Sequence, residues 1–157
     1  MKKLLTLSLL LLLTACSQTK PSALKDVIYP EKLNPNDSIV VNYDSQGCFH
    51  HRSNVLVFKK DSVTIYDNIN EWNQKYAEKK KVGTVKLTSS DQARLKSLFH
   101  YYQGELKGKC TTQDNIEINH YIDKTVISSK KIVDGTCGVE APERVTSFYE
   151  FVERARK

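Results

Sequence analysis

The sequence predicts an α+β fold, an antiparallel sheet of about five or six strands with two amphipathic helices packed on one face. Short runs rich in β-branched and aromatic residues alternate apolar and polar positions and are separated by brief turns, as antiparallel strands are. Two longer segments, 88–103 and 142–157, instead carry apolar residues at helical spacing. The resulting order of hairpin, helix, hairpin and helix suits two helices that cover one face of a sheet.

The first group of predicted strands lies between residues 38 and 87. Four runs have the composition of strands: SIVVNY (38–43), NVLVFK (54–59), SVTIYD (62–67) and VGTVKL (82–87). The polar segment 68–81 spaces Ile69, Trp72 and Tyr76 as one or two helical turns would. A loop that covers one edge of the core fits this segment equally well.

Residues 88–103 form the clearest predicted helix. Ser89 and Gln92 can form a capping box at its start, in which each side chain satisfies a free backbone donor. Gly104 can end the helix. The apolar positions are three or four residues apart and therefore share one face: Leu95, Leu98, Phe99 and Tyr102.

A second hairpin is predicted in residues 115–133. Apolar and polar residues alternate from Asn115 to Ile122, which is typical of a strand with one buried face. Asp123 and Lys124 can then turn the chain back into the run TVISSKKIV (125–133).

The C-terminal segment is the second predicted helix. Pro142 suits the first helical position, and its fixed φ favours a helix start there. Acidic residues lie at the start of the segment and basic residues at its end, which favours the helix dipole. The apolar positions again have helical spacing: Val145, Phe148, Tyr149 and Val152.

Residues 1–16 have the composition of an export signal. The basic start MKK is followed by an apolar run, Leu4–Leu13, which is far shorter than the roughly 20 residues of a membrane-spanning helix. The run ends in Leu13-Thr14-Ala15-Cys16. This ending resembles the lipobox of bacterial lipoproteins, in which one apolar and two small residues precede a cysteine.

The resemblance implies how the chain is processed. A signal peptide of residues 1–15 would be removed, the Cys16 thiol would receive a diacylglycerol, and the new amino group would be acylated, for example with palmitate. An anchor of more than one acyl chain holds stably in a membrane. Ser17 stands where an Asp would retain a lipoprotein in the inner membrane, so we expect the outer membrane, with the domain facing the periplasm and exposure at the cell surface left open.

Residues 16–37 are predicted to be the acylated cysteine and a flexible tether, and residues 38–157 a single domain. Three of the four prolines of the chain lie in this tether, at positions 21, 30 and 35, and no apolar periodicity is sustained there. Val27, Ile28 and Tyr29 are the tether residues that could dock on the domain.

The charge of the chain restricts the classes of partner that it suits. The formal net charge is +6, and removal of the signal peptide would take Lys2 and Lys3 away. A modest positive charge suits contact with anionic lipid or cell-wall polymer, and the basic run 79–81 could take part or could be only a solvated loop. We expect no nucleic-acid partner, because no nucleic-acid motif appears.

The cysteine count changes once Cys16 carries lipid. Three cysteines then remain, and the oxidising periplasm favours one disulfide among them. With a two-residue turn at 123–124 and no bulge, Cys110 and Cys137 would face each other at the open end of the second hairpin, so we predict that they form the bridge. Pairing of Cys48 with Cys110 or Cys137 is the alternative.

The segment GCFHHR (47–52) is the most suggestive place for chemistry. Cys48 and His50 are two residues apart and could bind zinc or copper, or a histidine could activate the thiol as a nucleophile. A metal site would need a third ligand from afar, His100 or His120. The interpretation we favour is a buried, inert thiol beside solvent histidines, with neither metal nor cofactor.

The sequence therefore predicts a membrane-anchored envelope lipoprotein that binds a protein, cell-wall or glycan partner without catalysis. No Ser-His-Asp signature, glycine-rich phosphate loop or paired-carboxylate motif appears in the chain. The mature part is loosely similar to small envelope lipoprotein domains of unknown function. Two alternatives stay open: an inhibitor or immunity protein against an envelope-directed enzyme, and a thiol- or metal-dependent enzyme centred on Cys48 and His50.

Overall fold

A computed structural model describes most of the segment that follows the predicted signal. The described residues are 28–48, 50–69, 78–103, 106, 108, 111–136 and 147–157. The predicted signal peptide, Cys16, Cys110, Cys137 and Gly104 therefore lie outside them. No helix among the described residues is long and apolar enough to cross a membrane.

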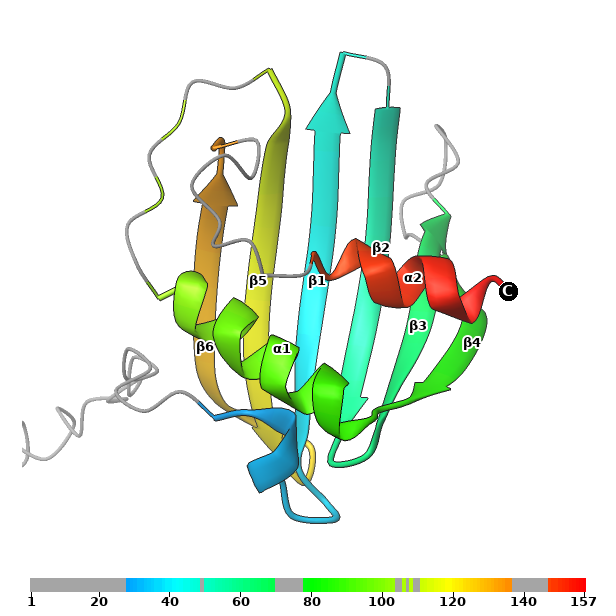
Figure 1. The fold of residues 1–157 in the computed structure, drawn as a ribbon, viewed down its shortest axis with the longest axis vertical. Helices are drawn as coiled ribbons and strands as arrows, with labels where there is room; N and C mark the ends of the chain where they lie inside the picture. The colour runs from blue at the N-terminus through cyan, green and yellow to red at the C-terminus, as the bar shows by residue number, and fades with distance from the viewer. Residues whose placement is uncertain are drawn as a thin grey trace, which may run out of the picture.

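A single six-stranded antiparallel sheet and two α-helices make up most of the described fold (Figure 1). The strand order is β4-β3-β2-β1-β5-β6, so β1 lies between strands that are far apart in the sequence. The elements are η1 (Pro30–Lys32), β1 (Ser38–Gly47), β2 (His50–Lys59), β3 (Ser62–Ile69), β4 (Glu78–Lys86), α1 (Ser89–Tyr101), β5 (Gln113–Ile122), β6 (Thr125–Asp134) and α2 (Tyr149–Ala155). The prediction of a mainly antiparallel α+β fold is confirmed.

The strands bury one set of alternating side chains. Along β1, Ile39, Val41 and Tyr43 are buried, and each pairs with a core position on β2 and β5. Because successive strand residues point to opposite faces, this parity carries the core across the sheet. Burying this apolar area is the main stabilising contribution to the fold.

Aromatic rings join the helices to the sheet. The ring of Phe58 on β2 lies 6.1 Å from that of Phe99 on α1 and 5.9 Å from that of Phe151 on α2, measured between centroids. Phe148 stacks on Tyr102 at 5.6 Å. In Figure 1, α1 crosses β6, β5 and β1, and α2 runs from β1 towards β4.

Two helix boundaries differ from the predictions. The capping box of α1 is formed by Thr88 and Asp91, because Asp91 accepts from the Thr88 backbone N–H at 2.8 Å and the Thr88 hydroxyl accepts from the Asp91 N–H at 3.2 Å. The predicted pair of Ser89 and Gln92 is therefore wrong by one residue. The second helix begins at Tyr149, after Ser147 and Phe148, which are described and not helical, so the predicted helix is wrong at these two positions; its predicted start at Pro142 lies outside the described residues.

The chain ahead of β1 packs on the domain. Pro30 and Leu33 are buried, and Ile28 and Tyr29 pack against the core. The docking expected of Ile28 and Tyr29 is therefore confirmed, and the packed part of the chain begins ahead of residue 38. In segment 68–81, residues 68–69 end β3 and 78–81 begin β4, so the described parts of this segment are strand.

The second hairpin turns where predicted but contains a bulge. Ile122 pairs with Thr125 across the turn, and Asp123 adopts a positive φ of 55°. The register then shifts between His120 and Tyr121. A β-bulge places two residues of one strand opposite one of the other. The count without a bulge, from which Cys110 was placed opposite Cys137, therefore does not hold along the described hairpin, and both cysteines lie outside the described residues.

Candidate functional site

The sheet face that carries the other set of alternating side chains includes many polar residues, together with apolar ones such as Val55 and Val133. On β1 this set includes Asn42, Asp44 and Gln46, which alternate along the strand with core positions such as Val41 and Tyr43. Neighbouring strands contribute residues of the same parity, since paired residues point to the same side of a sheet. The face can therefore offer side-chain hydrogen bonds to a partner.

A hollow of about 300 Å³ lies on this face. Its walls come from five strands, β1, β2, β3, β5 and β6, and most of its side chains are polar. The residues around it are Asn42, Tyr43, Asp44, Ser53, Asn68, Asn115, Ile116, Glu117, Lys131, Ile132 and Val133. We call this feature the sheet hollow. Its volume is at the lower end of the range for small-molecule sites.

One row of side chains crosses the sheet hollow from β1 to β6. Asn42, Glu117 and Lys131 are register partners on adjacent strands. The Asn42 amide donates to Glu117 Oε2 at 3.0 Å, and Lys131 Nζ lies 3.6 Å from Glu117 Oε1. The carboxylate therefore has a charged neighbour on one side and a hydrogen-bond donor on the other.

A second row lies two residues further along the same strands, about 7 Å away at the strand rise of roughly 3.4 Å per residue. Here Ser53, Asp44, Asn115 and Val133 are register partners on β2, β1, β5 and β6. The Asn68 amide donates to Ser53 Oγ at 3.0 Å. The Asn115 amide makes no side-chain hydrogen bond to any residue that the structure describes.

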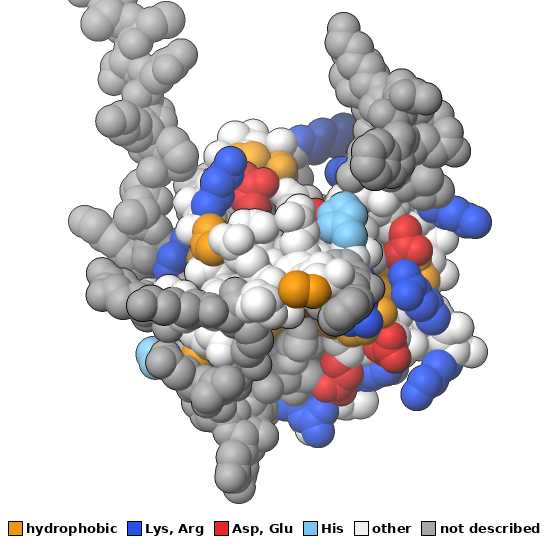
Figure 2. Space-filling view, turned by 90° about the horizontal axis from the view of Figure 1, so that it is seen from above, with side chains coloured by type: hydrophobic (Ala, Val, Ile, Leu, Met, Phe, Trp, Pro, Cys, Tyr) orange, Lys and Arg blue, Asp and Glu red, His pale blue; other side chains and the backbone are white. Residues whose placement is uncertain are grey.

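The sheet hollow has charged groups of both signs, two carboxylates and one ammonium group. Asp44 is contacted by His51 Nε2 at 3.0 Å and accepts from the Gln46 amide at 3.0 Å, and Glu117 has Lys131 beside it. Figure 2, which looks onto the molecule from the top of Figure 1, shows Lys or Arg side chains beside Asp or Glu side chains at several places on that end. The hollow therefore carries no strong field of one sign.

Among the described side chains, the structure brings together no group of the residues that were expected to do chemistry. Cys48 is a free thiol and is exposed, so the prediction of a buried Cys48 is wrong. No disulfide joins it to Cys110 or Cys137. His50 begins β2, and its side chain lies outside the described residues.

His120, one of the two candidates for the third ligand of a metal site, is too distant from His50. His50 pairs with Gly47 at one end of β1, whereas His120 pairs with Ile39 at the other end. The separation is roughly 27 Å at about 3.4 Å per residue, far beyond the span of one metal ion. In the described part of the chain, no group of three or more His, Cys, Asp or Glu side chains could hold a metal ion.

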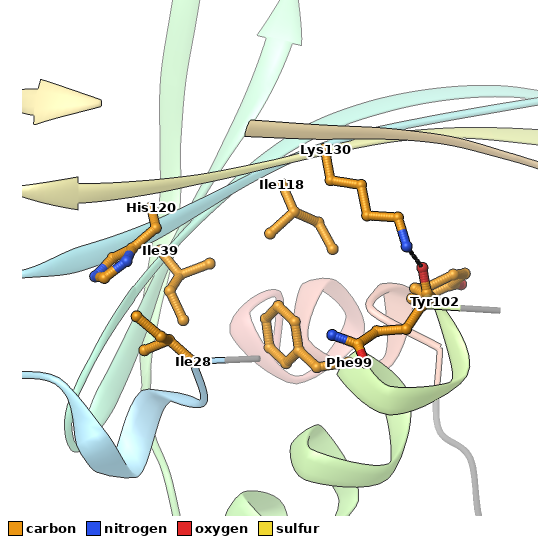
Figure 3. A pocket seen from close by; sticks show the side chains of 8 residues that line it. Ile28, Ile39, Phe99, Tyr102, Ile118, His120 and Lys130 are labelled. Atoms are coloured by element: carbon orange, nitrogen blue, oxygen red, sulfur yellow. Dashed lines mark hydrogen bonds between the residues drawn. The ribbon is translucent and has the colours of Figure 1, made fainter. Parts of the chain in front are cut away.

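His120 instead belongs to a small cavity under α1 (Figure 3). The cavity has a volume of about 20 Å³ and is lined by Ile28, Ile39, Phe99, Tyr102, Gln103, Ile118, His120 and Lys130. Lys130 donates to the Tyr102 carbonyl at 2.7 Å, and His120 lies towards the opposite end. Such a volume admits about one water molecule, which makes the cavity a part of the core and not a ligand site.

His120 is an unusual core residue. It is 4% exposed, and both ring nitrogens lack a hydrogen-bond partner among the described residues, as does Ser128 Oγ on the paired strand. Burial lowers the pKa of His120, and the negative charge of Asp37 opposes that shift only in part. The ring is therefore neutral near pH 7, which agrees with the prediction of a core histidine.

The buried phenol of Tyr43 holds the start of β5 in place. Tyr43 donates to Asp114 Oδ2 at 3.0 Å, and burial together with the Asp114 charge raises the pKa of Tyr43 to about 12. On β6, Asp134 accepts from both the backbone and the hydroxyl of Thr136. These contacts fix the strand ends beside the sheet hollow.

The comparisons with known proteins add no family to this picture. A scan against protein-family models finds no match to the chain, and a search of the curated proteins finds no significant match. The site therefore has to be interpreted from its own residues.

Proposed function

We propose that this protein is a lipid-anchored bacterial envelope protein that binds a partner through the sheet hollow without catalysing a reaction. The observation that carries the proposal is the hollow itself, a space of about 300 Å³ that polar side chains from five strands surround. The lipobox at Cys16 supplies the envelope location.

The proposal includes the packing of both helices on the opposite face of the sheet. It is supported by Phe58, whose single ring contacts Phe99 of α1 and Phe151 of α2. One side chain can reach both helices only if they approach it from its own side. This arrangement leaves the polar face accessible to a partner.

The anchor and tether are proposed to present this face near the outer membrane. The acylated Cys16 would lie in the membrane, with the domain on the periplasmic side. Because Ile28 and Tyr29 pack on the domain, the free tether would be residues 16–27. Twelve residues reach roughly 37 Å at about 3.1 Å per residue, so the domain would stay close to the lipid.

The anchor is tested by labelling cells with a radioactive or clickable fatty acid. We expect the wild-type protein to be labelled and to stay with membranes after a high-salt wash, and Cys16→Ala to lose both properties. Cys48→Ala is the matched control and should keep both. Salt-resistant membrane retention of Cys16→Ala would refute the lipid anchor.

The binding role is tested by crosslinking in living cells followed by purification of the full-length protein. We expect one envelope component to be captured by the wild type and by Lys124→Ala, an exposed turn variant, but not by the double variant Asn42→Ala, Glu117→Ala. Equal capture by the double variant would overturn the role of the sheet hollow. Recovery of an envelope hydrolase that the protein inhibits would instead favour the inhibitor alternative.

A further inference from the structure

We propose that the sheet hollow binds an N-acetylated sugar of a neutral glycan. This inference rests on the proposed binding function and specifies its ligand. It is carried by the two cross-strand rows of the hollow, which together offer hydroxyl-binding groups and a place for an acetamido group.

The first row suits sugar hydroxyls. A sugar hydroxyl both donates and accepts, so it is best met by groups of both kinds held side by side. Glu117 offers carboxylate oxygens, Asn42 an amide, and Lys131 an ammonium group. Lys131 Nζ lies 3.6 Å from Glu117 Oε1 and is therefore free to donate to a ligand placed between the strands.

The second row suits an acetamido group, which joins an amide to a methyl group. Asn115 and Val133 are direct register partners, so their Cβ atoms are about 5 Å apart on the same face. The Asn115 amide has free hydrogen-bond capacity within the described structure, and the Val133 side chain is 51% exposed. An amide beside an exposed apolar side chain matches the acetamido amide and its methyl.

The charge of the sheet hollow favours a neutral ligand. Two carboxylates, Asp44 and Glu117, lie close to one ammonium group, Lys131. An anionic ligand such as a phosphate would meet both carboxylates without a matching surplus of cations. Neutral hydroxyl and acetamido groups meet no such repulsion.

The dimensions of the hollow also restrict the ligand. A site of about 300 Å³ takes one sugar ring, with neighbouring rings lying outside it. Because the hollow opens on a broad sheet face, a glycan chain can continue over the strands on either side. The expected recognition unit is therefore one N-acetylated ring within a longer chain.

The test compares two trisaccharides that have the same β-1,4 linkage. One is built of N-acetylglucosamine and the other of glucose, so they differ in the acetamido groups. Binding to the full-length lipidated protein is measured by calorimetry and by saturation-transfer NMR, in a detergent without a sugar head group. We expect the acetylated trisaccharide to bind at least tenfold more tightly than the glucose trisaccharide.

Variants connect the preference to the structure. Asn115→Ala and Val133→Ser should each reduce the preference for the acetylated trisaccharide at least threefold. Val126→Ser is the control, because Val126 is an exposed apolar residue of β6 outside the hollow. Equal binding of the two trisaccharides, no binding of either, or an unchanged preference in Asn115→Ala would each overturn the inference.

This outcome can be separated from failure of the proposed function. If neither sugar binds while crosslinking in cells still depends on Asn42 and Glu117, the ligand class is wrong and the binding face stands. If crosslinking is independent of those residues, the binding face itself is wrong.

Discussion

At the scale of single residues, Asp91 is a buried charged group that connects the two helices. It is 4% exposed and receives two hydrogen bonds from Arg154, at 2.6 Å to Oδ1 and 3.2 Å to Oδ2. Burial alone would raise the pKa of Asp91, but the hydrogen bonds from Arg154 and Thr88 lower it to about 2. The carboxylate therefore stabilises the fold in its charged form.

Arg154→Met should lower the free energy of unfolding by about 3 kcal/mol at pH 7, because it leaves a buried carboxylate without its partner. The stability that Asp91 contributes is complete above its unfolded pKa of about 3.9 and is lost as pH falls through about 2. Urea unfolding between pH 7 and pH 2 should therefore show a smaller acid loss in the variant.

Arg94→Met is the matched control. The ion pair of Arg94 with Glu150 has a similar distance of 3.1 Å but is largely exposed, so its loss should cost less than about 1 kcal/mol. A similar cost for Arg94→Met and Arg154→Met would show that the Asp91 contact contributes nothing special.

His120 also makes stability fall in acid, but in a higher pH range than Asp91 and because of burial without a charged partner. Burial lowers its pKa in the folded state, so below about pH 6.5 the unfolded chain binds a proton that the folded chain does not. The contribution of His120 to the free energy of unfolding is therefore highest above pH 6.5 and falls by at most about 1.4 kcal/mol per pH unit below it. Asp37 and Lys130 are the charged groups near the cavity.

His120→Leu should remove this loss. The difference in unfolding free energy between pH 7 and pH 5 should be smaller in His120→Leu than in the wild type, measured by urea denaturation. His100→Asn changes an exposed helix residue and should keep the wild-type difference. An unchanged pH dependence in His120→Leu would mean that the His120 proton is not coupled to folding.

At the scale of elements, α2 approaches the sheet closely over β4. A Cβ on Gly83 would lie 2.8 Å from the Ala155 carbonyl oxygen and 3.3 Å from the Ala155 Cβ. The absence of a side chain at Gly83 therefore allows the end of α2 to contact the strand. Arg156 supports the same approach, because it donates to Asp67 on β3 at 3.0 Å.

Gly83→Ala should destabilise the protein by about 1–3 kcal/mol, because the added methyl group forces α2 or β4 to move. The loss should appear as a lower Tm in a thermal scan. Gly135→Ala is the matched glycine control, since its nearest contact would be 3.4 Å, an ordinary van der Waals distance, and it should change stability by less than about 1 kcal/mol. Equal Tm values for the two variants would contradict the close approach of α2.

The elements also show where sequence patterns succeed. Alternation predicted β1, β2, β3 and β5, because each strand buries one parity of residues. It underestimated β4, whose residues 78–81 are Glu-Lys-Lys-Lys and exposed. An edge strand needs no buried face, so apolar alternation is absent there, and lysines discourage further strand pairing.

At the scale of the whole molecule, the sheet hollow could not be predicted from local patterns. The polar parity of residues such as Asn42 and Asn115 is visible in the sequence. Their meeting depends on the strand order, in which β1 pairs with β5 more than seventy positions later. No turn or local motif specifies that pairing, since it follows from packing the shared core between distant strands.

The predicted bridge between Cys110 and Cys137 also depends on contacts between distant segments, and one contact beyond the second hairpin bears on it. The described pairing of β5 with β6 ends at Asp114 and Asp134, four positions after Cys110 and three positions before Cys137 in the sequence. Beyond it, the segments stay together, because a Cβ on Gly108 would overlap the Gly135 backbone. Cys110 and Cys137 lie outside the described residues, but each follows one of these glycines by two positions in the sequence, so we expect them to lie near each other.

Non-reducing peptide mapping of the purified protein should therefore find Cys110 linked to Cys137, with Cys48 as a free thiol. The bridge closes a loop of about 28 residues, and the chain-entropy model gives it roughly 3 to 4 kcal/mol. Cys110→Ser and Cys137→Ser should thus lower the unfolding free energy by similar amounts, and reducing agent should abolish the difference from the wild type. Cys48→Ser should leave stability unchanged, because its thiol is exposed. A peptide that links Cys48 to either partner would refute this connectivity and place the bridge across the sheet instead of at the end of the hairpin.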